Sequence, residues 1–272
     1  KATRVITRQS RLATAGAIAT ASIDLAAVRP QHSVCKAFSA HQYPECSRQC
    51  AATGMDTLNK KSFIYKEILR RLLTRHYRFG ESLSVKELSL ETGISRQPIM
   101  SALTSLQERG FVRVTAQVGC EVISPLPDEV DDFYKMVASL EGIIAELASR
   151  RGTAEEARKL KQINDQFAQI PPADQDDAAT FLPINWEFHK QLHRMARSPL
   201  ICAKQLVNFE LSDFFIVQTC GFSDRLSRVE KEHDQVIEGI LSGDHQRAHQ
   251  AAAEHLSSVA TNVVSHMRRS LE

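Results

Sequence analysis

Residues 55–124 open with apolar positions at helical spacing. Ile64, Ile68 and Leu72 recur every four residues, with lysines and arginines on the other faces, and this pattern is typical of an amphipathic helix. The sequence Phe79-Gly80-Glu81 interrupts it, because glycine disfavours a helix interior. The pattern therefore predicts a first helix of about three turns that ends before this break.

Two shorter helices follow, separated by a tight turn. The first starts at Ser84-Val85-Lys86-Glu87, a capping-box order, and we expect it to run to about Glu91. Thr92-Gly93-Ile94 predicts a turn with a positive φ at the glycine. Ser95 is expected to cap the next helix, which carries Pro98 in its first turn. That helix ends at Gly110, and its apolar face consists of Ile99, Leu103 and Leu106.

Two strands complete this segment. Residues 111–115 and 120–123 are rich in β-branched and apolar side chains, and residues 116–119 form the tip of the predicted hairpin. A helix-turn-helix followed directly by a hairpin has the order of a winged helix-turn-helix. Its second helix fits the major groove of DNA, and the amino-terminal end of that helix directs N–H donors toward phosphates and base edges.

Three polar residues occupy that amino-terminal end, Ser95, Arg96 and Gln97. Arginine binds guanine or phosphate and glutamine reads adenine, so we predict that these residues face double-stranded DNA. The alternative is a winged helix that contacts other proteins. The order of capping box, turn, Ser-Arg-Gln-Pro start and wing favours DNA.

Residues 125–272 predict helices almost throughout. Pro125-Leu126-Pro127 has the composition of a short, stiff linker. Asp128 is expected to cap a helix that runs to about Arg151 and ends at Gly152. The apolar stripe of this helix consists of Val130, Phe133, Val137, Leu140, Ile144 and Leu147.

Further signals divide the remainder of this domain, residues 128–272. Thr153-Ala154-Glu155-Glu156 is a second capping box, and Pro171-Pro172 with the acidic stretch at 174–177 predicts a loop. Pro183 is expected near a helix start, and Pro199 opens another helix. The last two helices span roughly residues 225–241 and 244–267. The fold class is therefore mostly α, with a winged helix-turn-helix followed by an all-α helical bundle.

Four residues of the bundle have the spacing of a metal site. Asn185 and His189 lie four apart and share a helix face. His233 and His255 lie on the last two helices and face the same interior if those helices pair antiparallel about Gly243. Imidazoles from three helices and one oxygen ligand suit a divalent metal ion. The alternative is that these histidines are structural or solvated.

Three histidines and an open position would also suit a hydrolytic zinc site. Such a site needs a general base, and Glu187 and Glu232 adjoin the candidate ligands in sequence. Adjacent residues on a helix point about 100° apart, so we expect neither to serve, and we predict that the protein is not an enzyme. A metal-free interaction module on a winged helix is the other alternative.

Charge and composition add to this picture. Residues 55–124 carry a net charge of +4 and residues 125–272 a net charge of −7, so we expect only the first segment to meet a polyanion. The six cysteines form no CxxC pair, and no apolar run reaches the ~20 residues of a membrane span. We expect a protein of the cytoplasm.

Residues 1–54 are rich in Ala, Ser, Thr and Arg and poor in acids. One explanation is an organelle transit peptide, which shares this composition. The other is that Met55 is the natural start and the upstream residues are a non-native extension. In both cases we expect the segment to be mostly disordered.

Residues 62–123 resemble the DNA-binding domain of the GntR family of regulators. The family's "PGExL" turn corresponds to Phe79-Gly80-Glu81-Ser82-Leu83, and its "GVSRTPVREAL" core to the eleven residues from Gly93 to Leu103. The resemblance implies that Lys86, Ser95, Arg96 and the wing residue Gly119 contact DNA. Met100 stands where the family usually has an arginine, so one DNA contact is expected to be missing.

Residues 128–260 resemble the FCD effector domain of the FadR-type branch of that family. Its "D..FH" motif corresponds to Asn185-Trp186-Glu187-Phe188-His189, and its second motif includes Glu232-His233, Gly243-Asp244 and His255-Leu256. The resemblance implies a metal ion, zinc or nickel, bound by Asn185, His189, His233 and His255.

The resemblance also implies a pocket for a small organic acid, a carboxylate, beside the metal ion. Two positions depart from the family. Asn185 replaces an aspartate and brings no charge to the metal ion, and Val137 stands where an arginine is frequent. We therefore expect a ligand-responsive, homodimeric transcriptional regulator, a repressor, that binds a DNA operator.

Overall fold

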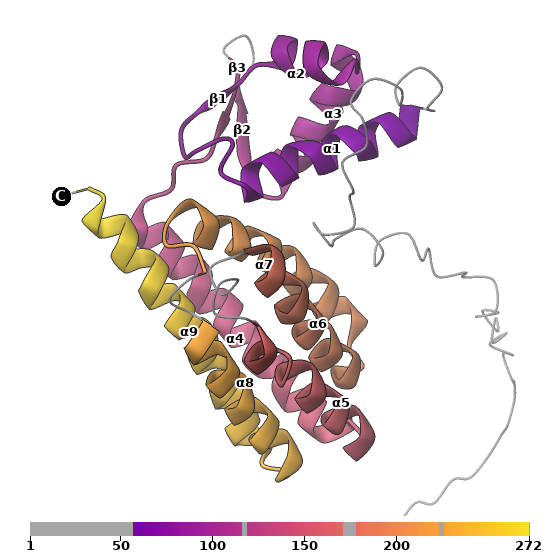
Figure 1. Ribbon diagram of the computed structural model, residues 1–272, viewed down its shortest axis with the longest axis vertical. Helices are drawn as coiled ribbons and strands as arrows, with labels where there is room; N and C mark the ends of the chain where they lie inside the picture. Colours follow the sequence, from indigo (N-terminus) through magenta and orange to yellow (C-terminus); the bar gives the residue numbers. More distant parts are fainter. Residues whose placement is uncertain (1–56, 116–118, 171–177, 223–225, 272) are drawn as a thin grey trace, which may run out of the picture. The chain divides into compact units, whose positions relative to one another are not determined.

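The computed structural model describes residues 57–115, 119–170, 178–222 and 226–271 (Figure 1). The expectations for residues 1–54 and for the loop at 171–177 lie outside these ranges, as does most of the predicted hairpin tip.

The amino-terminal domain combines three helices with a three-stranded antiparallel sheet (Figure 1). The helices are α1 (Thr57–Leu73), α2 (Val85–Thr92) and α3 (Arg96–Glu108). The strands are β1 (Ser82–Leu83), β2 (Val112–Thr115) and β3 (Gly119–Val122), in the spatial order β1-β3-β2. In the wing, Val112 pairs with Val122 and Thr115 with Gly119. The winged helix-turn-helix predicted from the sequence is present.

Most helix ends of this domain follow their local signals. Gly93 ends α2 in the left-handed conformation at φ 69°, as predicted, and the Ser84 hydroxyl accepts the Glu87 N–H, which is one of the two bonds of the predicted capping box. Ser95 occupies the N-cap position of α3. Contrary to the prediction, its hydroxyl makes no capping hydrogen bond. The sequence analysis also missed β1, because a two-residue strand has no period of its own and is stabilised by its pairing with β3.

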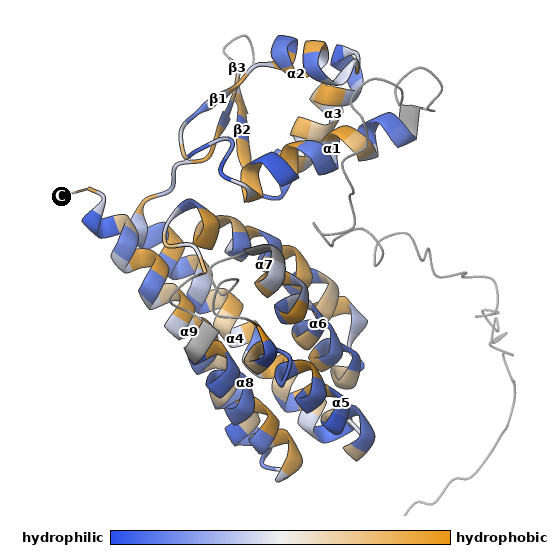
Figure 2. Cartoon of the chain, in the orientation of Figure 1, coloured by the Kyte–Doolittle hydropathy of each residue, from blue (hydrophilic) through white to orange (hydrophobic). Residues whose placement is uncertain are grey.

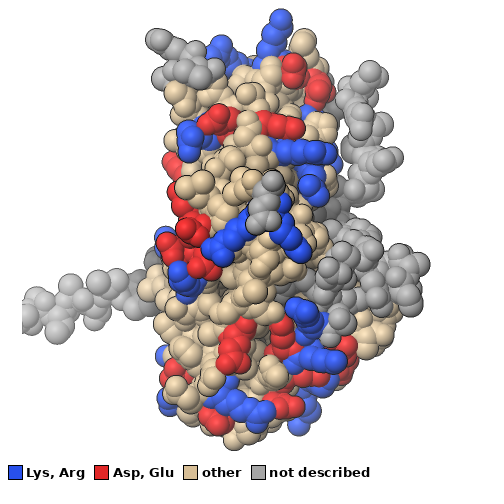
Figure 3. Space-filling model, turned by 90° about the vertical axis from the view of Figure 1, so that its left-hand side faces the viewer, with Lys and Arg blue, Asp and Glu red and all other residues tan. Residues whose placement is uncertain are grey.

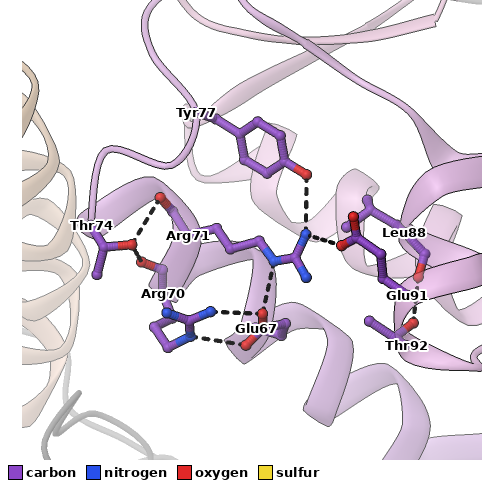
Figure 4. Close-up of polar contacts among 8 residues, drawn as sticks. All are labelled: Glu67, Arg70, Arg71, Thr74, Tyr77, Leu88, Glu91 and Thr92. Carbon is purple, nitrogen blue, oxygen red and sulfur yellow. Dashed lines mark hydrogen bonds and ion pairs between the residues drawn. The ribbon is translucent and has the colours of Figure 1, made fainter. Parts of the chain in front are cut away.

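A partly buried arginine, Arg71, connects α1 to α2 (Figure 4). Arg71 Nε donates to Glu67 Oε1 at 2.7 Å on α1, and Arg71 Nη1 donates to Glu91 Oε2 at 2.6 Å on α2. The same Nη1 lies 3.4 Å from the Tyr77 hydroxyl. Only 11% of the Arg71 side chain is exposed, so these partners supply the hydrogen bonds that water would otherwise make.

The carboxy-terminal domain is a helical bundle, as predicted. It contains α4 (Pro127–Arg151), α5 (Ala154–Asn164), the short 3₁₀ helix η3 (Phe167–Gln169), α6 (Ala178–Ala196), α7 (Pro199–Gln218), α8 (Leu226–Leu241) and α9 (His245–Arg269). Helix α4 packs along α9 and also contacts α6, α7 and α8, and α8 pairs with α9. Apolar residues alternate with polar ones along these helices (Figure 2), as expected when one side of each helix is buried.

Two predicted helix starts differ from the structure. Leu126 rather than Asp128 is the N-cap of α4, because Pro127 can occupy the first helical position and the Glu129 carboxylate accepts the Leu126 N–H at 2.7 Å. Pro183 lies inside α6 rather than near its start, since that helix begins at Ala178. The capping box at Thr153 forms in full.

Helices α8 and α9 approach closely at Gly239. A Cβ atom at this position would lie 2.6 Å from the backbone nitrogen of Ala248 and 2.8 Å from its Cα. Only glycine permits this backbone approach. This close approach brings together the helix that carries His233, α8, and the helix that carries His255, α9.

No helix in the described ranges combines the length and the apolarity that a membrane span requires.

Candidate functional site

The residues predicted to face DNA lie on the surface of the winged helix. Ser95, Arg96 and Gln97 at the start of α3 are exposed, and so is Lys86 in the first turn of α2. The two residues after them on α3, Pro98 and Ile99, are buried and fix the helix against its own domain. The amino-terminal end of α3 therefore presents polar side chains to solvent.

The second strand of the wing, β3, begins with an exposed glycine. Gly119 has a φ of 141°, which side-chain-bearing residues rarely adopt, and no atom lies within 4 Å of where its Cβ would be.

On the face drawn in Figure 3, lysines and arginines lie among aspartates and glutamates. That face therefore carries no uniformly basic surface.

Three histidines meet in the interior of the bundle. His189 on α6, His233 on α8 and His255 on α9 each offer a ring nitrogen, and these nitrogens all lie within 4.8 Å of one another. All three side chains are buried, with exposures of 4%, 0% and 5%. The structure thus brings together the three histidines that the sequence analysis selected from three separate helices.

Each of these rings is held through Nδ1 by an oxygen. The contacts are His189 to Glu141 Oε1 at 2.9 Å, His233 to Asn164 Oδ1 at 3.1 Å, and His255 to Glu232 Oε2 at 2.7 Å. A carboxylate can only accept, so His189 and His255 donate from Nδ1.

The amide orientation of Asn164 determines the third tautomer. Its Nδ2 donates to Glu230 O at 2.9 Å and to Asp234 Oδ1 at 2.8 Å, which leaves Oδ1 as the atom that accepts from His233. In the neutral form, each of the three imidazoles then carries its lone pair on Nε2. In metal sites, histidine ligands are oriented in the same way, because the ring nitrogen that does not bind the metal ion donates its N–H to an oxygen.

A buried carboxylate organises the α6 side of the site. Glu141 on α4 contacts His189, and its Oε2 lies 3.0 Å from His193 Nε2 and 3.1 Å from Gln205 Nε2. Burial raises the pKa of Glu141, but the interactions with His193 and His189 outweigh it and hold the pKa below the ordinary value. Burial lowers the pKa of His189 despite Glu141, which favours the neutral ring that a metal ion requires.

A pocket opens beside the three histidines. Asn185 lies one turn before His189 on α6, and both line the pocket together with His255. The other lining residues are Phe181, Phe209, Ser212, Asp213, Ile216, Val229, Leu256 and Val259. All four predicted metal ligands therefore belong to one region, with Asn185 on the pocket wall.

Sequence reasoning missed the residues behind the histidines. Glu141 lies at helical spacing between the buried Val137 and Ile144, and Asn164 lies likewise one turn after the buried Leu160. A polar residue within an apolar stripe was the available signal. Glu232 is expected from helix geometry to point away from the candidate ligands. It instead contacts His255 on the neighbouring helix. The contact is to Nδ1, whereas the lone pair of this ring is on Nε2.

The fold and the site define a two-domain protein with a winged helix and a helical domain that surrounds a buried histidine cluster. Residues 60–122 match the gntR family of bacterial regulatory proteins, and residues 132–258 match the FCD domain. The chain belongs to the GntR family and carries an FCD domain. It is a transcriptional regulator and not an enzyme. The predicted family and fold class are thereby confirmed, and the hydrolase alternative is set aside.

Individual relatives agree with this assignment. The chain is 23% identical over 214 residues to the HTH-type transcriptional regulator YdhC of Bacillus subtilis, a match that covers 76% of this chain and 91% of the relative. It is 24% identical over 204 residues to the HTH-type transcriptional repressor RspR of Escherichia coli K12, covering 74% and 87%.

A solved structure of a GntR-type protein shares the fold. The putative regulator GntR of Rhodococcus sp. RHA1 superposes with a TM-score of 0.61 at 12% identity, covering 76% of this chain and 98% of the other.

Proposed function

We propose that this protein is a ligand-responsive regulator whose helical domain binds a divalent metal ion, zinc or nickel, and a small organic effector beside it. The observation that carries the proposal is the convergence of three buried imidazoles whose Nδ1 atoms are all engaged by oxygens. Neutral histidine nitrogens with this outer support are the donors that zinc and nickel accept.

His189, His233 and His255 would hold the metal ion, with the Asn185 amide oxygen as the fourth ligand. When bound, the ion supplies a positive charge and a Lewis-acidic position at the pocket. Asn185 carries no charge to balance the ion, but Glu141 and Glu232 lie behind the rings of His189 and His255 and would offset part of the charge of the ion. The residues also join α6, α8 and α9, so that metal binding would order the bundle.

The winged helix would bind a DNA operator. Arg96 and Gln97 at the start of α3 are placed to reach base edges, while Ser95, Lys86 and the wing at Gly119 would contact the backbone. Support comes from the exposure of these residues beside the buried Pro98 and Ile99. Met100 supplies no positive charge where relatives usually carry one, so phosphate contacts are fewer.

We propose in addition that the protein acts in the cytoplasm as a homodimeric repressor. Support comes from the two-fold symmetry typical of operators read by helix-turn-helix proteins and from the relative named as a repressor.

A DNA-binding titration of the full chain tests this proposal. Fluorescence anisotropy on the promoter region of its own gene should show binding that weakens steeply with salt. Adding zinc or nickel to chelator-treated protein should change the affinity. Arg96→Ala should weaken binding at least tenfold, whereas Arg194→Ala, which removes an exposed arginine from α6 of the helical domain, serves as a charge-matched control. Binding that does not weaken with salt would contradict the proposal. So would an affinity for DNA that is the same in chelator-treated protein and after zinc or nickel is added.

A further inference from the structure

Helix α4 exposes a row of four side chains at a spacing of seven residues: Glu129, Met136, Ile143 and Arg150. Because seven residues make almost two full turns, the row drifts around the helix by only about 20° at each step. The four side chains therefore share one side of α4. The two at the centre of the row are apolar, and Met136 is 51% exposed and Ile143 45% exposed.

Partly buried apolar residues widen the centre of this row. Leu140 and Leu147 pack against the core of the bundle, and Phe133 packs against the apolar cluster that contains Val137. Phe133, Leu140 and Leu147 also recur every seven residues, one turn away from Met136 and Ile143. Single exposed apolar side chains are common on protein surfaces. Two adjacent apolar rows at this spacing are instead typical of a seam that pairs one helix with another.

The two ends of the row carry opposite charges. Glu129 lies in the first turn of α4 and Arg150 in its last turn. Each makes hydrogen bonds near its own place in the helix, since the Glu129 carboxylate accepts the Leu126 N–H and Arg150 donates to Glu146. Both charged groups nevertheless stay at the surface, where they can meet a charge of opposite sign on another molecule.

The row is complementary to itself. Met136 and Ile143 lie equally far from its midpoint, and so do Glu129 and Arg150. When a second α4 lies antiparallel across a two-fold axis at this midpoint, Met136 faces the partner's Ile143 and Glu129 faces the partner's Arg150. An interface around a two-fold axis requires such a self-complementary surface. A parallel arrangement would place Glu129 against the partner's Glu129, and like charges repel.

We infer that a second copy of this chain docks on α4 through this row, with the two α4 helices antiparallel. The inference rests on the proposed function, which includes a homodimer, and it names the surface of that homodimer. The apolar centre excludes water from the contact, and the charged ends set the direction and the register of the two helices. The buried side of α4 carries Glu141, which contacts His189, so one helix would join the histidine cluster to the partner.

Sedimentation equilibrium of the full chain tests the inference. The wild type should be a dimer, and Met136→Asp should raise the dimer dissociation constant at least tenfold, because the new carboxylate loses water against the partner's Ile143. Leu200→Asp is the matched control, since it makes the same change at an exposed apolar residue on α7, outside the row. It should leave the dissociation constant within about threefold. Circular dichroism confirms that each variant is folded.

An exchange of charges tests the antiparallel direction. Glu129→Arg and Arg150→Glu should each weaken the dimer about tenfold, because each places like charges opposite one another at both ends of the contact. The double variant should recover most of this loss, since it restores opposite charges across the axis. If the two residues acted only on the stability of α4, the double variant would instead be weaker than either single variant.

The outcomes separate the inference from the proposed function. A monomeric wild type would overturn the inference and the proposed homodimer together. A dimeric wild type whose dissociation constant is unchanged in folded Met136→Asp would overturn the inference and leave the homodimer in place. A double charge variant that is weaker than both single variants would do the same. The titrations with DNA and metal decide the other parts of the proposed function independently.

Discussion

Replacing Gly239 by alanine should separate the two helices that carry His233 and His255. The added Cβ would lie 2.6 Å from Ala248 N and 2.8 Å from Ala248 Cα, both backbone atoms that cannot rotate away. Restoring ordinary contact at 3.4 Å requires α8 to move by about 0.8 Å relative to α9. Metal–nitrogen distances tolerate only about 0.2 Å.

Two opposing contributions set the change in stability. Alanine in a helix interior is more favourable than glycine by about 1 kcal/mol, while overpacking a tight contact costs about 1–3 kcal/mol. We expect the free energy of unfolding of the metal-free protein to fall by about 1 kcal/mol. The affinity for zinc should fall at least tenfold, because the displacement exceeds what the three ligands tolerate.

The assay is a competition titration of zinc against a chromophoric chelator, together with chemical unfolding of the metal-free protein. Glu238→Ala is the control, since this exposed neighbour on α8 makes only a surface ion pair with Arg247 and should change stability by less than about 1 kcal/mol. The opposite result would be an unchanged zinc affinity in Gly239→Ala together with a free energy of unfolding raised by about 1 kcal/mol. It would mean that the higher helix propensity of alanine outweighs the close contact at Ala248, and it would refute the reasoning.

Three further predictions concern single side chains. Burial raises the pKa of Glu210 to about 7 from 4.5, so its contribution to stability is fully present below pH 4.5 and is lost by pH 7, a change on the order of 3 kcal/mol. Glu210→Gln should flatten that slope in unfolding titrations between pH 4.5 and 8, and a slope as steep as in the wild type would contradict this. Glu141→Gln removes the charge behind His189 and should weaken zinc binding about 10–100-fold in the chelator competition; an unchanged affinity would show that Glu141 does not support the ligand. Thr153→Ala removes the complete capping box of α5 and should lower the free energy of unfolding by about 1 kcal/mol with no effect on zinc affinity, which thermal unfolding and the same titration would check.

Local signals were sufficient for most helix ends and for the winged helix. Gly93 adopts the positive φ that its turn requires, and the Thr153 capping box forms in full. The apolar spacing of Ile99 and Leu103 also places them in the core of their domain. These features depend on residues close in sequence, which is why a pattern of a few residues predicts them.

Features that depend on distant residues were harder to predict. The strand at Ser82 exists through its pairing with Glu121, and Pro183 lies within a helix that begins five residues before it. The histidine cluster was predicted because the turn at Gly243 implies that the last two helices pair. The partners of the histidines, Glu141 and Asn164, come from other helices, and nothing in their own segments specifies which ring they contact.

The metal content of protein purified without chelators tests the central claim most directly. The measurement compares the wild type with His233→Ala and with His266→Ala, a control on α9 outside the histidine cluster. We predict about one transition-metal ion per chain in the wild type and in His266→Ala, and loss of the ion in His233→Ala. A wild-type protein without metal, or equal metal content in His233→Ala, would contradict the assignment of a metal centre to these histidines.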